Sequence, residues 1–265
     1  MPTSSSVQAS SRFPAGTFTP APKRATPAKM LAAQGKMETI LFLRHGEQQL
    51  LSIIIPLVAL VALSKVDVIP GDNTIKMIFP FALATAAMSS GFTGQAISLA
   101  FDRRYGALKR TGASGVPAWT IIFGKVIAVI AVTIVQIIIL GITALLLGWT
   151  APVGGVIFGV ITIFVGVASF TAFGMLMGGT LSSELVLALA NLIWVVLSGL
   201  AGWAVFSPSV DANGWLSIIP SIALSQGMVD AFNGQLPWLQ LGILAVWFAG
   251  SGFAATKLFS FAGDR

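Results

Sequence analysis

The side chains that could do chemistry in this chain gather in one stretch, Phe101–Pro117. Two runs without any charged residue, 77–100 and 127–148, lie on either side of it. The stretch contains one acidic and four basic residues: Asp102, Arg103, Arg104, Lys109 and Arg110. Charges placed between apolar runs favour a segment that lies against a membrane face. Such a segment can be a docking helix on which a partner protein pushes, or a basic loop that only sets membrane orientation.

The spacing within this stretch predicts a short amphipathic helix. Phe101, Tyr105 and Leu108 fall on one side of a helix, and the basic residues spread over the rest of its surface. The helix is predicted to end at three breakers: Gly112, Gly115 and Pro117.

Catalytic motifs are absent from the sequence. The chain has no Cys, and therefore no disulfide, thiolate metal site or cysteine nucleophile. It also lacks a Gly-x-x-x-x-Gly-Lys-Ser/Thr phosphate loop, a His-Glu-x-x-His motif and a Gly-x-Ser-x-Gly elbow. Residues 43–47 match the Arg-His-Gly signature of histidine phosphatases, a family that needs a second His. Because His45 is the only one here, we interpret the match as coincidence and predict that the chain is not an enzyme.

The composition is that of an integral membrane protein. Of 265 residues, 55% are hydrophobic and 9% are charged, against about 25% charged residues in ordinary soluble domains. The mean hydropathy is +0.90. A soluble fold of this length could not hide so much apolar surface. The net charge is +6, and the basic residues that produce it lie beside apolar segments. Membrane topology explains this placement, so no nucleic-acid partner is predicted.

The apolar segments predict an all-α polytopic membrane protein with six transmembrane helices. The spans are expected at roughly 49–64, 77–99, 118–147, 153–177, 185–206 and 236–259. Residues 28–48 mix apolar and basic residues, which predicts an N-terminal interfacial helix. Residues 207–235 are broken by Pro and Gly, which predicts two short external helices, as a re-entrant segment or at the surface.

The amino-terminal region has a different composition. Residues 1–28 are rich in Ser, Thr, Pro and Ala, which predicts a disordered cytoplasmic tail, with a targeting segment as the alternative. The remaining residues, 29–265, are predicted to form one membrane domain.

The distribution of basic residues predicts the orientation. With a cytoplasmic amino terminus, only Lys65 and Lys76 lie on the opposite face. The cytoplasmic face then holds thirteen basic residues: Arg12, Lys23, Arg24, Lys29, Lys36, Arg44, Arg103, Arg104, Lys109, Arg110, Lys125, Lys257 and Arg265. Both termini and the charged stretch are therefore predicted to be cytoplasmic.

The predicted membrane interior offers no proton relay. Glu184 and Lys125 lie near cytoplasmic ends of spans, and no Asp or His falls within a span. The polar residues inside are expected to form helix-packing hydrogen bonds more often than substrate contacts: Gln95, Thr133, Gln136, Thr143, Thr162, Ser169, Thr171, Asn191 and Ser198. If the chain moves a substrate uphill, another subunit must supply the energy.

These features together resemble the permease subunits of type-2 ATP-binding-cassette exporters. The resemblance covers about residues 30–262. It rests first on the six-span layout. The segment Asp102–Pro117 is similar to the acidic-Arg-x-x-Gly-x-Leu coupling segment of that family. Ile219-Pro220 and Met228–Gly234 resemble its external re-entrant helices. The family more often has Glu at the position of Asp102.

The resemblance implies a permease that forms the substrate path of an exporter in the plasma or inner membrane. Two separate ATPase subunits, which hold ATP and Mg²⁺, and a second permease copy or a homologous permease would complete it. The coupling helix near 101–112 would be formed by Asp102, Arg103, Arg104, Tyr105, Gly106 and Leu108. The candidate substrate-path residues are Asn191, Gln136 and Ser90. The substrate is not indicated beyond an amphipathic compound, and the alternatives are a secondary transporter, a channel or a membrane anchor subunit.

Overall fold

The computed structural model describes residues 25–44, 46, 50–66, 74–113, 116–207 and 209–258. These residues form helices joined by turns, without a strand among them, so the all-α prediction is confirmed. Several predictions fall outside the described residues: those on residues 1–24, His45, residues 67–73, Gly115 and residues 259–265.

Five helices are long and apolar enough to cross a membrane. One is continuous from Ile75 to Arg104 and consists of α4 (Ile75–Met88), the π-helical turn η2 (Ser89–Thr93) and α5 (Gly94–Arg104). The other four are α7 (Ala118–Leu146), α8 (Val153–Thr180), α9 (Ser183–Phe206) and α11 (Trp238–Leu258). They correspond to the second to sixth predicted spans.

The first predicted span is shorter than the others. It consists of the π-helical turn η1 (Leu50–Ile54) and helix α3 (Ile55–Leu63), with the apolar part running from Ser52 to Leu63. At about 1.5 Å per residue, these residues do not reach across a hydrocarbon core of about 30 Å. Five long spans are therefore confirmed, and the sixth stays a prediction.

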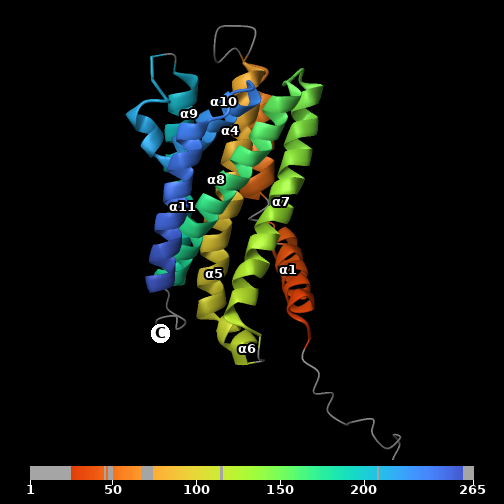
Figure 1. Cartoon of the computed structure of the whole chain (residues 1–265), viewed down its shortest axis with the longest axis vertical. Helices are drawn as coiled ribbons and strands as arrows, with labels where there is room; N and C mark the ends of the chain where they lie inside the picture. Colours follow the sequence, from red (N-terminus) through yellow and green to blue (C-terminus); the bar gives the residue numbers. More distant parts are fainter. Residues whose placement is uncertain are drawn as a thin grey trace, which may run out of the picture.

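The α4–η2–α5 helix lies at the centre of the bundle (Figure 1). In its most apolar window, 78% of the residues are buried, against 22% for α9 and 17% for α11. The outer helices consequently present apolar side chains outward, as helices in contact with lipid or with another subunit do. A movement of the central helix would reach every helix packed around it.

Helix α8 approaches the central helix and α10 (Pro220–Phe232) through glycines. A Cβ atom on Gly174 would lie 2.5 Å from the carbonyl oxygen of Phe92, and one on Gly178 would meet the backbone of Ala96. A Cβ atom on Gly155 would meet the carbonyl oxygen of Phe232, and one on Gly159 would meet the Phe232 ring. Both Gly-x-x-x-Gly pairs of α8 therefore lie at helix–helix contacts, where small residues let backbones come close.

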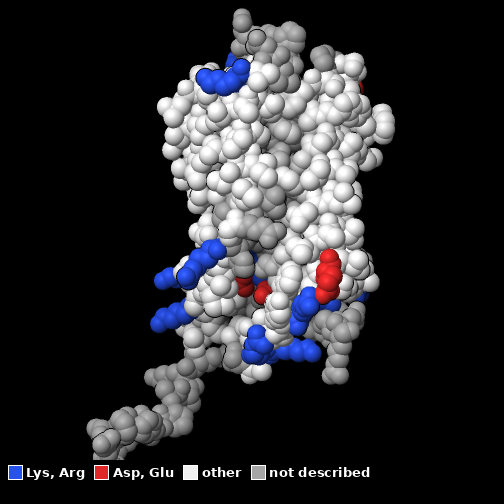
Figure 2. Space-filling model, turned by 180° about the vertical axis from the view of Figure 1, so that it is seen from behind, with Lys and Arg blue, Asp and Glu red and all other residues white. Residues whose placement is uncertain are grey.

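The two ends of the bundle differ. Helix α6 (Ala107–Ala113) lies at one end, with α1 (Pro27–Arg44) running alongside the neighbouring part of α7; the 3₁₀ turn η3 (Trp215–Ile218) and α10 lie toward the other (Figure 1). The two short helices predicted within 207–235 are thus present. The Lys and Arg side chains visible in Figure 2 gather mainly toward the end that carries α6, as the predicted asymmetry requires.

Candidate functional site

The charged stretch forms a broken helix rather than one continuous helix. Helix α5 ends at Arg104, and α6 begins at Ala107. Gly106 between them has a φ of +66°, a left-handed conformation that glycine adopts without the steric cost of a Cβ. Arg110 stabilises the break by donating a 2.6 Å hydrogen bond to the carbonyl oxygen of Tyr105. The prediction of a single helix over this stretch is wrong at this point.

The break also changes which residues face inward. Leu108 is buried against Leu99 and Ile121, as the amphipathic pattern predicts. Tyr105, predicted on the same side, is 63% exposed, because the turn at Gly106 separates its direction from that of α6. The exposed basic and aromatic side chains of the stretch, which we call the basic face, are Arg104, Tyr105, Lys109 and Arg110.

Arg103 holds the end of α8 against the central helix. Its side chain is 5% exposed and donates hydrogen bonds of 2.9 and 3.0 Å to the carbonyl oxygens of Gly178 and Leu181. The last carbonyl groups of a helix lack partners within the helix and carry partial negative charge, so a guanidinium group suits them. Arg103 is therefore a link inside the protein and not part of an exposed surface.

Arg104 makes the corresponding contact with the start of α9. It donates a 3.1 Å hydrogen bond to Ser183 and forms an ion pair with Glu184. Both charged side chains are largely exposed, at 49% and 66%, so water screens this pair. The two neighbouring arginines thus connect the end of α5 to both sides of the turn between α8 and α9.

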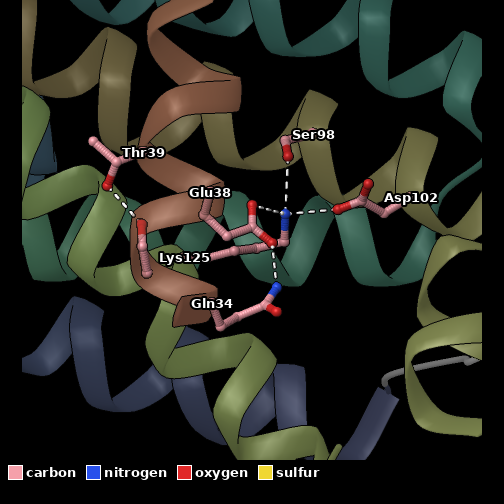
Figure 3. Close-up of polar contacts among 7 residues, drawn as sticks. Gln34, Glu38, Thr39, Ser98, Asp102 and Lys125 are labelled. Carbon is pink, nitrogen blue, oxygen red and sulfur yellow. Dashed lines mark hydrogen bonds and ion pairs between the residues drawn. The ribbon is translucent and has the colours of Figure 1, made fainter. Parts of the chain in front are cut away.

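Asp102 points inward, toward Lys125 on α7 (Figure 3). The Lys125 amine lies 2.6 Å from an Asp102 carboxylate oxygen and 3.1 Å from a Glu38 carboxylate oxygen, and it donates a 2.9 Å hydrogen bond to Ser98. Gln34 donates to the second Glu38 oxygen at 3.0 Å. This group, which we call the lysine cluster, joins α1, α5 and α7.

The sequence pattern predicts no role for Glu38 and Ser98, and it indicates Lys125 only as a charge that sets membrane orientation. A signal for them exists in the sequence. Lys125 is the only charged residue of α7 and lies well inside the helix, where an ionisable side chain needs a partner. Asp102 is the nearest acidic residue before Lys125 in the sequence and is therefore a candidate for its partner. Glu38 could not be assigned as the other partner without knowing that α1 packs on α7.

The candidate substrate-path residues separate into two places. Ser90 and Gln136 are fully buried and contact each other at 3.4 Å. The Gln136 amide also donates to the carbonyl oxygens of Ser52 and Ala86, at 3.0 and 3.2 Å. Asn191 lies elsewhere, on α9, with its amide donating to Leu187 of the same helix. Its carbonyl oxygen is buried without a hydrogen-bond partner among the described residues.

A second polar group lies toward the opposite end of the bundle. Asp230 on α10 accepts hydrogen bonds from Gln226 at 2.8 Å and from Gln240 at 3.4 Å. Burial raises the pKa of Asp230, and hydrogen bonds with the side chains of Gln226 and Asn213 oppose that rise. Within the described part of the chain, no three His, Asp or Glu side chains come together as a metal site would require.

A comparison with protein families gives a match over most of the chain. A family model described as ABC-2 family transporter protein matches residues 48–260. The chain belongs to the ABC-2 transporter family. The matched region begins just before η1 and ends after α11, so all five long helices and the charged stretch lie inside it and α1 lies before it. Comparisons with curated proteins and with solved structures gave no match.

Membership of the ABC-2 family confirms the resemblance found in the sequence. The protein is a multi-pass membrane permease of an ABC transporter. Permeases of this family normally lack an ATPase site of their own and work with ATP-binding subunits.

Proposed function

We propose that the chain forms the substrate path of an ABC exporter and that two separate ATPase subunits drive it through residues 101–112. The observation that carries the proposal is the set of contacts at the start of this stretch. Asp102 contacts α7, Arg103 contacts the end of α8, and Arg104 contacts the start of α9. Three consecutive side chains therefore join the charged stretch to three spans besides its own.

The basic face supports docking of a partner at the same place. The four side chains of the basic face are exposed on one short segment. Leu108 of the same segment packs inward against Leu99 and Ile121. An acidic and apolar groove on an ATPase subunit would fit this surface, because aromatic and Arg side chains dominate docking surfaces. Of the predicted coupling residues, Arg104 and Tyr105 would then contact the partner. Asp102, Arg103 and Leu108 would pass the movement inward, and Gly106 would shape the turn.

The remaining parts of the proposal follow from charge and exposure. The end that carries α6 would be cytoplasmic, with both termini, because basic residues favour that side of a plasma or inner membrane. ATP and Mg²⁺ would bind in the partner subunits.

A second permease, identical or homologous, would pack on α9, whose exposed apolar side chains include Leu192, Val195 and Trp203. Asn191 lies on this helix, and its buried carbonyl oxygen would have to turn outward to reach an amphipathic substrate at the interface between copies. Gln136 and Ser90 are buried within one copy, so a contact between them and substrate would require the spans to separate.

Co-purification of the tagged chain from its native membrane tests the proposal. The wild-type chain should bring down an ATP-binding subunit whose ATP hydrolysis depends on the permease. Combining Tyr105→Ala with Lys109→Glu changes only exposed side chains and should abolish both binding and stimulated hydrolysis. Lys257→Glu, a charge reversal on an exposed lysine of α11, is the matched control and should bind normally.

Two results would contradict the proposal. If the double variant binds and stimulates like wild type, the stretch only sets orientation. If the wild type recovers no ATP-binding subunit, a secondary transporter, a channel or an anchor subunit explains the chain better. Polar substitutions inside the spans then separate these alternatives, because an anchor should tolerate them.

A further inference from the structure

The lysine cluster is an unusual arrangement for a membrane helix. The Lys125 side chain is 2% exposed, and its two carboxylate partners are 12% and 32% exposed, so this charge lies inside the protein and its partners only partly reach the surface. Buried ions lose their hydration, and a chain keeps them only where paired groups replace the water. The carboxylates come from different helices, Glu38 from α1 and Asp102 from the end of α5 (Figure 3).

The cluster contains more partners than one lysine needs. Lys125 contacts two carboxylates and the Ser98 hydroxyl, and Glu38 also accepts a hydrogen bond from Gln34. One contact of Lys125 can therefore break while another carboxylate still balances its charge. A single buried ion pair lacks this property, because parting the two ions leaves both uncompensated.

Apart from this cluster, α1 is held mainly by its contact with α7. Gly35 of α1 packs on Ile127, and Gly124 of α7 packs on Gln34. Both contacts bring α1 close to the helix that carries Lys125, and neither involves the charged stretch. Among the described polar contacts, the route from α1 to the charged stretch runs from Glu38 through Lys125 to Asp102.

We propose that Lys125 is a positioning residue that ties α1 to the charged stretch, so that α1 follows the movement the ATPase subunits impose. The inference rests on the proposed function and extends it to a helix that precedes the family match. Because Ser98 and Asp102 both lie on α5, a movement of the charged stretch reaches Glu38 on α1 through Lys125. The amino-terminal helix is thereby held in one position relative to the coupling segment.

Distance measurements on the permease alone test this link without any partner subunit. The chain has no Cys, so Lys36→Cys on α1 and Ala113→Cys on α6, both at exposed positions, introduce two spin labels in an otherwise unlabelled chain. Double electron–electron resonance in lipid nanodiscs should give one narrow distance distribution for the wild-type background. Lys125→Met should lose that single distribution, and Lys125→Arg, which keeps the charge, should retain it. Labels at Lys257→Cys and Ala113→Cys form the control pair, which should not change.

A charge-free variant separates a positioning role from a purely structural one. The combination of Glu38→Gln, Asp102→Asn and Lys125→Met removes every ion of the cluster and should recover the melting temperature of the wild type. If Lys125 positions α1, this triple variant still shows the broad distance distribution and a loss of stimulated ATP hydrolysis in the complex. Lys125→Arg should keep stimulated hydrolysis.

The proposal is overturned by either of two results. The distances between α1 and α6 can stay unchanged in Lys125→Met, which would mean that apolar packing on α7 alone holds α1. The triple variant can also restore both the narrow distribution and stimulated hydrolysis, which would leave the cluster no role beyond stability. Neither result affects the proposed function, because that depends on recovery of an ATP-binding subunit by the wild-type chain.

Discussion

Two polar groups hold this bundle together, and they differ in kind. Gln136 in the interior links three segments through neutral hydrogen bonds to the carbonyl oxygens of Ser52 and Ala86. Lys125 near the charged end also links three segments, but through ions. Backbone carbonyl groups fix the position of Gln136, whereas Lys125 is surrounded by side chains that can change partners. The comparison sets an interior group that is held by the backbone against a charged group that is held only by other side chains.

The location of the π-helical turns supports this difference. Ser52 lies within η1, and Ala86 lies just before η2. A π-helical turn shifts the hydrogen-bond pattern of the backbone and leaves carbonyl groups in need of a donor. Gln136 donates to the Ser52 carbonyl from the facing helix and is a second donor to the Ala86 carbonyl, which also accepts the Ser89 N–H. The interior group therefore lies beside both π-helical turns and donates to the backbone at each of them.

Lys125→Met is expected to have the largest effect on stability. It leaves two carboxylates in the protein without a counter-charge, and breaking a buried pair by removing one partner costs about 3–5 kcal/mol. The free energy of unfolding in detergent, measured by denaturant titration, should fall by that order. A loss smaller than that of Gln136→Leu would reverse the comparison between the two groups.

Arg103→Met should cost less, on the order of 1.5–3 kcal/mol, because hydrogen bonds to charged groups contribute about that much. The substitution leaves the carbonyl oxygens of Gly178 and Leu181 without their donor at the end of α8. The same denaturant titration measures the loss. Arg103→Lys is the control and should recover part of it, since an ammonium group reaches one carbonyl but lacks the planar fork.

Gln136→Leu should lower the free energy of unfolding by about 1 kcal/mol, within the range of interhelical hydrogen bonds measured in membranes. Ser90→Ala is the matched control and should cost less, because the Ser90 hydroxyl also bonds to Ala87 of its own helix. If Gln136→Leu instead leaves stability unchanged and alters transport, Gln136 acts in the substrate path, as the sequence suggested.

The long apolar runs predicted five of the spans because hydrophobic length alone defines a membrane helix. The break at Gly106 was not predicted, because Phe101, Tyr105 and Leu108 fit one helical face whether or not the helix is interrupted. The φ of Gly106 decides between a continuous helix and an interrupted one.

The charged stretch that forms the candidate site could be located in the sequence, but the directions in which its side chains point could not be predicted. Asp102 and Arg103 look like surface charges beside Arg104 in the sequence, yet both turn inward. The reason lies in tertiary contacts, since their partners are the end of α8 and a lysine of α7. A single sequence carries no record of which helices meet, and so it cannot assign these partners.

Arg104→Met should have the smallest effect on the permease itself, although it changes a charge next to Arg103. Its partner Glu184 is exposed, and water and salt screen such a pair, so we expect no measurable change in the melting temperature. The same substitution should weaken recovery of the ATP-binding subunit, because it removes a charge from the basic face. Glu184→Gln breaks the same ion pair without touching that face and should leave recovery unchanged. Loss of recovery in both variants would mean that the Arg104–Glu184 pair, and not the basic face, positions the partner.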